Sequence, residues 1–272
     1  MNKYSQIRYW VDNLPKLGTM SFSIEDAVAE FPEKDYAQIK NAINRLSKSG
    51  KIQSVWKGYY AIVRPEYGLK GIVPPTEYID GLMTHLEQKY YVALLSAADL
   101  LGAAHQKPQV FTFISDYFMH PKLNENVRLV PVYKKRITEK YLTKMNVWSG
   151  SIFVSSPELT MIDLLMYHQK SGGLNHVVTV LSELTEAVDF GKVDNDFFVG
   201  LPASALQRLG FLLDDVLEDS VQADLLLDKI QRAGIKFRKC LLATSNTQDN
   251  AKDYPINSKW KIIVNYEVEA DI

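Results

Sequence analysis

The residues of this sequence with the most specific chemical potential are amide and basic side chains between positions 34 and 57. Asn and Gln can make paired hydrogen bonds to the edge of an adenine, while Lys and Arg can bind guanine edges or phosphate oxygens. No acidic residue lies among them after Asp35. A small residue, Ala37, would let the backbone approach a groove closely. The predicted contact residues are Lys34, Ala37, Gln38, Lys40, Asn41, Asn44, Arg45, Lys48, Lys51 and Lys57.

A helix from about Asp35 to Ser49 would present most of these side chains on one side. Its apolar residues fall within one arc of about 100° on a helical wheel, and the opposite arc is polar. Gly50 is suited to end this helix. The apolar arc consists of Ile39, Ala42, Ile43 and Leu46, and the centre of the polar arc of Ala37, Asn41, Asn44 and Lys48. One side is therefore predicted to be buried and the other to contact nucleic acid.

The neighbouring segments complete the pattern of a winged helix-turn-helix. A first helix is expected over residues 4–14. A second begins after Ser23, which can form a capping box with Asp26. Residues 51–63 are typical of a β-hairpin whose Lys-Gly turn obtains its positive φ from the glycine. Three helices followed by a hairpin with a basic tip are the element order of a winged helix.

The rest of the chain is predicted to be a larger mixed α/β (α+β) domain. Proline and glycine are frequent between Arg64 and Pro75, which indicates a linker and divides the chain into residues 1–70 and 71–272. The expected helices are at about 76–89, 92–101, 157–171, 175–187, 202–213 and 221–233. The expected strands are at about 110–114, 127–133, 147–148, 152–154, 236–243 and 260–269, with a polar stretch at 245–254 before the last.

The charge of the chain is close to neutral as a whole but uneven along its length. There are 31 Lys+Arg and 32 Asp+Glu in total. Residues 1–70 contain 11 basic and 7 acidic residues, whereas residues 146–272 contain 11 and 18. A protein coated with basic charge is therefore excluded, but a local nucleic-acid-binding face is not.

A second basic cluster, Lys134, Lys135 and Arg136, follows the strand predicted at 127–133. Two interpretations remain open for it. The charges could protect a strand edge from unwanted pairing, or they could extend the DNA contact beyond the winged helix. We include these three residues among the candidate DNA-binding residues.

No catalytic, metal or cofactor site is predicted, and the protein is not expected to be an enzyme. The five histidines lack metal-ligand spacing, and no phosphate-binding glycine loop or nucleophile elbow is present. Asp214 and Asp215, followed by Glu218 and Asp219, are acidic enough to suggest a metal, but a solvated helix end is the favoured interpretation. The single cysteine, Cys240, excludes an internal disulfide and is expected to be a buried apolar side chain.

The sequence contains no stretch of 18 uncharged apolar residues and begins with mixed polar residues. We therefore expect neither a membrane span nor a signal peptide, and a cytoplasmic location.

Several segments together resemble the AbiEi-type antitoxins of bacterial abortive-infection systems, the type IV toxin–antitoxin class. They are the linker at 67–75, the apolar segment at 90–98, the strand that begins Val110-Phe111-Thr112, and the Ser-Ser-Pro-Glu-Leu-Thr-Met-Ile-Asp-Leu segment at 155–164. The resemblance covers nearly the whole chain apart from the last thirty residues.

This resemblance implies a transcriptional autorepressor whose winged helix binds double-stranded DNA, commonly inverted repeats in its own promoter. It implies an antitoxin role in phage defence that the C-terminal domain carries, with possible help to DNA binding. The functional partner would be a nucleotidyltransferase-like toxin, and a stable complex with it is not required.

Three alternative hypotheses assign the protein to other functional classes. The winged helix could dock a protein partner, or the chain could be a transcriptional regulator without an antitoxin role. An endonuclease-like enzyme would need acidic residues of the α/β domain to hold a metal ion. Salt-insensitive binding to a protein, without a mobility shift of DNA, would favour the protein-docking hypothesis. Metal-dependent nicking of DNA would favour the endonuclease hypothesis.

Overall fold

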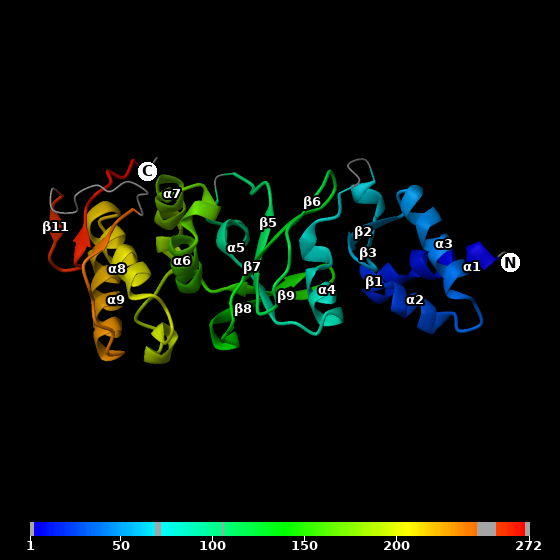
Figure 1. Cartoon of the computed structure of the whole chain (residues 1–272), viewed down its shortest axis with the longest axis horizontal. Coiled ribbons are helices and arrows are strands. Elements are labelled where there is room, and N and C mark those ends of the chain that lie inside the picture. Colours follow the sequence, from blue (N-terminus) through cyan, green and yellow to red (C-terminus); the bar gives the residue numbers. More distant parts are fainter. Residues whose placement is uncertain (1–2, 69–71, 105, 244–253, 270–272) are drawn as a thin grey trace. The chain divides into compact units, whose positions relative to one another are not determined.

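The computed structural model describes residues 3–68, 72–104, 106–243 and 254–269 (Figure 1). Contacts divide the chain into two compact units. The first comprises Met1–Val92 and Gln109–Val154, and the second Ala93–Pro108 and Ser155–Ile272. The boundary expected at residue 70 stays a prediction.

The first unit begins with the three helices predicted for a winged helix. They are α1 (Lys3–Asn13), α2 (Ile24–Glu30) and α3 (Tyr36–Lys48). A short 3-10 turn (Leu14–Leu17) follows α1 and ends at Gly18, whose φ of +80° suits a residue without a Cβ. The capping box of α2 is present, because the Ser23 side chain accepts from the Asp26 amide at 3.0 Å and the Asp26 side chain accepts from the Ser23 amide at 2.7 Å.

A three-stranded sheet completes the winged helix. Strands β2 (Ile52–Trp56) and β3 (Tyr59–Ile62) form the predicted hairpin, and the turn residue Gly58 has a φ of +72°. A third strand that the sequence did not predict, β1 (Ser21–Ser23), pairs antiparallel with β3. Three residues are too few to show the alternation by which a strand is recognised.

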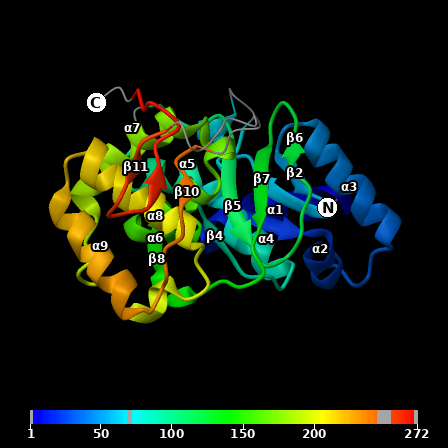
Figure 2. The same ribbon diagram turned by 60° about the vertical axis from the view of Figure 1, so that its left-hand side comes forward.

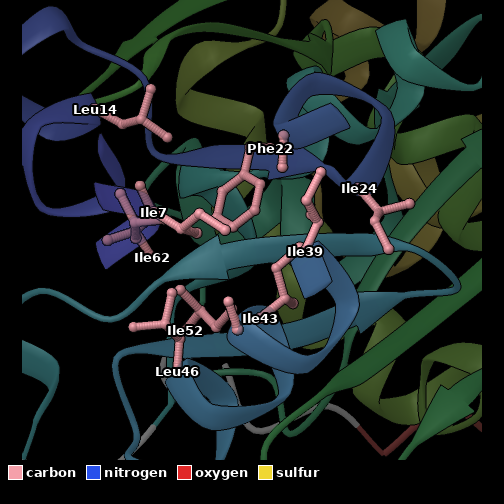
Figure 3. Close-up of a cluster of buried hydrophobic side chains, with 12 residues drawn as sticks. Ile7, Leu14, Phe22, Ile24, Ile39, Ile43, Leu46, Ile52 and Ile62 are labelled. Carbon is pink, nitrogen blue, oxygen red and sulfur yellow. The ribbon is translucent and has the colours of Figure 1, made fainter. Parts of the chain in front are cut away.

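The core of the winged helix lies between the helices and this sheet (Figure 3). The apolar arc of α3 is buried as predicted, with Ile39, Ile43 and Leu46 at 0% exposure. Their side chains point towards Phe22 and residues of the other elements (Figure 3). Each fully buried Leu, Ile or Phe contributes roughly 1.5–3 kcal/mol relative to exposure. Because this core holds one side of α3, the opposite side faces outward.

The first unit also contains a six-stranded mixed sheet, in the order β6-β7-β5-β4-β9-β8. The strands are β4 (Tyr90–Val92), β5 (Phe111–Ser115), β6 (Lys122–Leu123), β7 (Arg128–Tyr133), β8 (Leu142–Val147) and β9 (Gly150–Ser155). Strands β5 and β7 run parallel, with Ser115 beside Tyr133, while β4 runs antiparallel to β5.

Two predicted helices differ from the structure. The segment expected to be one helix over 76–89 forms a 3-10 turn (Pro75–Glu77) and α4 (Ile79–His85). The helix expected from residue 92 begins two residues later as α5 (Leu94–Leu100), because Tyr90–Val92 joins the sheet. The apolar run is buried all round, so its periodicity could not distinguish a central strand from a buried helix.

The second unit is mainly helical. With α5 it contains α6 (Pro157–Met166), α7 (Leu174–Leu184), α8 (Ala203–Phe211) and α9 (Ser220–Arg232). The Ser156 side chain caps α6 by accepting from the Leu159 amide at 3.3 Å, as its sequence predicts. The expected fold class is confirmed: a winged helix-turn-helix precedes a larger mixed α/β region.

A small sheet lies beside α8 (Figure 2). It consists of β10 (Cys240–Leu241), β12 (Ile262–Ile263) and β11 (Ile256–Asn257), in that order. The strands expected at 236–243 and 260–269 are therefore much shorter than predicted, and most of the polar stretch at 245–254 falls outside the described residues.

The acidic residues that follow α8 hold this sheet in place. Asp214 accepts a hydrogen bond from the Trp260 indole at 3.0 Å and lies 2.6 Å from the Lys259 ammonium. Asp215 accepts from the Asn257 side chain at 3.0 Å. The cluster lies at a helix end, with Asp215 and Glu218 exposed as expected, but Asp214 and Asp215 also have partners within the fold that the sequence did not predict.

Within the described part of the chain, no helix is long and apolar enough to cross a membrane.

Candidate nucleic-acid interface

The outward side of α3 is the centre of the candidate interface. Seven of the predicted contact residues come from this helix and all are exposed: Ala37, Gln38, Lys40, Asn41, Asn44, Arg45 and Lys48. The buried stripe opposite them fixes the rotation of the helix, so these side chains share one surface. A surface of cations, amides and one small residue has the donors and acceptors needed to contact phosphates and base edges.

Three lysines of the candidate interface are not neutralised by neighbouring carboxylates. Among the described residues, Lys40, Lys48 and Lys57 have no carboxylate within salt-bridge distance. An unpaired exposed ammonium keeps its full attraction for a phosphate, because no internal ion pair must first be broken. Lys57 lies exposed in the turn between β2 and β3, which is the tip of the wing.

Two predicted cations differ from this pattern. The Lys34 side chain is only 3% exposed; it pairs with Glu33, and its ammonium lies 4.6 Å from the centre of the Phe31 ring. Its inclusion as an exposed contact is corrected, because a cation held over a ring between α2 and α3 is a packing element. Lys51 is half exposed at the base of the wing and lies 3.5 Å from the Asp12 carboxylate, which partly offsets its charge.

Tyr36 is a candidate contact that sequence reasoning missed. It occupies the first position of α3 and is 55% exposed. A tyrosine hydroxyl in the first turn of this helix can donate to a phosphate oxygen. Tyrosine is neither an amide nor a cation, so Tyr36 was not among the predicted contact residues. Its position directly before Ala37 on the same helix could have indicated it.

A buried glutamine braces the wing. Gln53 on β2 is 7% exposed; its side chain accepts from the Val73 amide at 3.0 Å and donates to the Asn126 carbonyl at 2.7 Å. The Lys122 ammonium donates to the Ser54 carbonyl at 3.1 Å. The edge strand of the wing is therefore fastened to the chain after it and to the β6–β7 hairpin, which restricts its position.

The basic cluster at 134–136 lies on a different element from α3. Lys134 is half-buried, and its ammonium donates to the Tyr91 hydroxyl at 3.1 Å. Lys135 and Arg136 are exposed. Strand β6 pairs only with Arg128 and Leu129, the first two residues of β7. Among the described residues, the edge of β7 next to the basic cluster is therefore not paired with β6. Both interpretations of the cluster, edge protection and DNA contact, are compatible with this position.

The acidic residues, histidines and cysteine outside the candidate interface do not form a metal site among the described residues. Among the residues that the structure describes, no group of three or more His, Cys, Asp or Glu side chains could hold a metal ion. His168 Nδ1 lies 3.1 Å from the Leu165 carbonyl. Cys240 is half-buried, which corrects the expectation of full burial; burial raises the pKa of its thiol and nearby Arg208 opposes this.

One family model matches the chain. Residues 91–215 match the AbiEi antitoxin C-terminal domain. The resemblance to the AbiEi-type antitoxins is thereby confirmed, on a segment that runs from β4 into the short helix after α8.

Among solved structures, the crystal structure of the RV2827C protein from Mycobacterium tuberculosis is similar to this chain. The TM-score is 0.65 at 16% sequence identity, over 96% of this chain and 91% of that chain. At this identity the similarity shows the fold alone. The search of curated proteins found no match.

Proposed function

We propose that this protein, whose residues 91–215 match the AbiEi antitoxin C-terminal domain, is an antitoxin that also represses its own operon. In this proposal residues 1–70 bind double-stranded promoter DNA, commonly at inverted repeats. The remaining residues, 71–272, counteract a nucleotidyltransferase-like toxin of a type IV system. No catalytic step or cofactor is required of the chain.

The observation that carries the DNA-binding part is the exposed side of α3. Asn41 and Asn44 lie on the side opposite the buried stripe, with Lys40 and Lys48 near them. In a winged helix this helix enters the major groove, where asparagine can read adenine and lysine can bind phosphate or guanine. Lys57 at the wing tip is then placed to contact the backbone beside the groove.

A reporter experiment tests repression. The DNA upstream of the gene is fused to a reporter, and the full-length protein is supplied from a second plasmid. We expect strong repression by the wild type and loss of repression by Lys40→Ala/Lys48→Ala. Lys16→Ala is the control, because Lys16 is an exposed cation on the turn after α1. Equal repression by all three proteins would contradict the assignment of α3.

A growth experiment tests the antitoxin part separately. The neighbouring gene is expressed alone and together with this chain from an unrelated promoter, so that autorepression cannot affect the result. We expect the neighbouring product to stop growth alone and growth to recover on co-expression, also with Lys40→Ala/Lys48→Ala. Recovery that needs the α3 lysines would show that the two activities are not separate, and no recovery at all would contradict the antitoxin role.

A further inference from the structure

Three large aromatic side chains are exposed near one end of the six-stranded sheet. Tyr117 and Phe118, which follow β5, are 50% and 62% exposed. Tyr133, the last residue of β7, is 50% exposed. Large apolar side chains are usually covered, so three exposed rings in two adjoining segments indicate a contact surface.

The backbone brings these segments together. Strands β5 and β7 are parallel neighbours, so both chains leave the sheet at the same end. Ser115 lies beside Tyr133, the Lys134 amide donates to the Ser115 carbonyl at 2.9 Å, and the Tyr117 amide donates to the Ser115 hydroxyl at 3.1 Å. The exposed rings therefore flank one junction and do not depend on a distant loop.

This end of the sheet is also basic. At this end, residues 115–120 and 133–140 contain four Lys+Arg and two acidic residues, Asp116 and Glu139. Glu139 is paired with Lys89 at 2.7 Å, and the Asp116 side chain accepts from the Lys89 backbone amide at 3.0 Å. Lys135 and Arg136 are exposed directly after Tyr133. The surface thus combines exposed rings with an excess of positive charge.

We propose that this end of the sheet binds single-stranded nucleic acid. Tyr117, Phe118 and Tyr133 stack on unpaired bases, while Lys135 and Arg136 contact the phosphates between them. Exposed rings beside cations are the combination used for strands without sequence preference, since every base has a face on which a ring can stack. A duplex hides the faces of its bases, so duplex binding would leave the three rings without a role.

The proposed surface is separate from the winged helix and does not depend on duplex binding by α3. It goes beyond the proposed autorepression, because the winged helix reads paired bases through their groove edges. DNA and RNA both have bases for the rings to stack on and phosphates for the cations to contact. RNA differs by its 2′-hydroxyl groups, so a preference for one strand would show that the surface recognises or excludes this group.

The test measures binding of short fluorescent oligo-dT and oligo-U strands to the full-length protein by anisotropy. We expect the wild type to bind at least one strand with an affinity that falls as salt rises. Tyr117→Ala/Tyr133→Ala should weaken this binding about fivefold to more than a hundredfold per lost stack. Tyr117→Phe/Tyr133→Phe keeps both rings and should bind like the wild type, which separates stacking from a folding defect.

A second comparison separates this surface from α3. Asn41→Ala/Asn44→Ala should leave binding of the strands unchanged, and Tyr117→Ala/Tyr133→Ala should leave binding of a duplex unchanged. No binding of either strand at low salt overturns the proposal, and would fit a surface that contacts a protein. Wild-type strand binding by the tyrosine-to-alanine variant, or loss of strand binding in the α3 variant, overturns it as well.

Discussion

The two small three-stranded sheets of this protein use charged side chains in opposite ways. Beside the sheet of the winged helix, Lys40, Lys48 and Lys57 are exposed and, among the described residues, have no carboxylate partner. Beside the sheet of the second unit, the Lys259 ammonium lies 2.6 Å from Asp214 and 2.8 Å from Asp224. The first set of charges has no partner within the described residues, and the second is used within the fold.

This contrast explains why the net charge of the chain was a poor guide to function. A paired charge has little attraction left for a distant phosphate, whereas an exposed cation keeps it. The acidic residues that make the second half of the chain negative include those that hold the β10–β12 sheet. The overall neutrality therefore conceals a local basic face.

The largest effect is expected where the second sheet is anchored. Trp260 is fully buried, and its ring lies so close to Gly210 that a Cβ at that position would be 2.0 Å from it. Trp260→Ala should lower the free energy of unfolding by about 3–5 kcal/mol, measured with urea. Val221→Ala, at an exposed position on α9, should change it by less than about 0.5 kcal/mol. A small effect of Trp260→Ala would show that this sheet is not anchored as described.

Gln53, which braces the wing, should contribute less to the free energy of unfolding than Trp260 does. Gln53→Ala leaves the Val73 amide and the Asn126 carbonyl without their partner, which should cost about 1–3 kcal/mol of stability. Ser54→Ala on the same strand removes an exposed hydroxyl that donates to the Trp56 carbonyl at 3.3 Å, where water can replace it, and should be nearly neutral. Denaturation curves that coincide for the two variants would mean that Gln53 does not fasten the wing.

The paired charges predict a pH dependence. Burial pushes the pKa of Asp214 up, but the Lys259 ammonium and the Trp260 indole outweigh it and hold that pKa below its usual value. A depressed pKa stabilises the fold at neutral pH, and this contribution is lost as pH falls through the acid range.

Asp214→Asn should therefore be less stable than the wild type by about 1 kcal/mol at pH 7. The difference should shrink as pH falls below about 4. Thermal unfolding measured across pH checks this, with Asp228→Asn as the control because its pair with Arg232 is exposed. A difference that does not depend on pH would contradict the assigned ion pair.

The smallest effect is expected at the wing tip. Lys57→Ala should lower the salt dependence of duplex binding by about one unit in the slope of log affinity against log salt. Lys16→Ala removes an equal charge from the turn after α1, outside the candidate interface, and should leave the slope unchanged. If both variants change it equally, the charge of the whole chain matters and its placement does not.

The winged helix could be predicted in detail because its signals are local. The capping box of Ser23, the buried stripe of α3 and the glycine in the wing turn each depend on residues within one element. The third strand, β1, could not be predicted because its three residues obtain their pairing from β3, which lies far along the sequence.

The candidate sites also differ in how far local sequence patterns predict them. The exposed side of α3 follows from helical geometry, so most of its residues could be predicted. The burial of Lys34 depends on Phe31 and on the turn before α3, and its charge alone suggested exposure. The exposed rings near Tyr133 come together only through the parallel pairing of β5 with β7.

The central claim is that α3 reads promoter DNA, and specific against non-specific affinity tests it most directly. Binding to the DNA upstream of the gene and to a scrambled duplex is measured at one salt concentration for the wild type, Asn41→Ala and Asn44→Ala. We predict that the wild type prefers the upstream DNA. Each substitution that removes a base contact should reduce this preference by about 1–3 kcal/mol while binding to the scrambled duplex stays unchanged. A wild type without preference, or variants that keep the full preference, would contradict the claim.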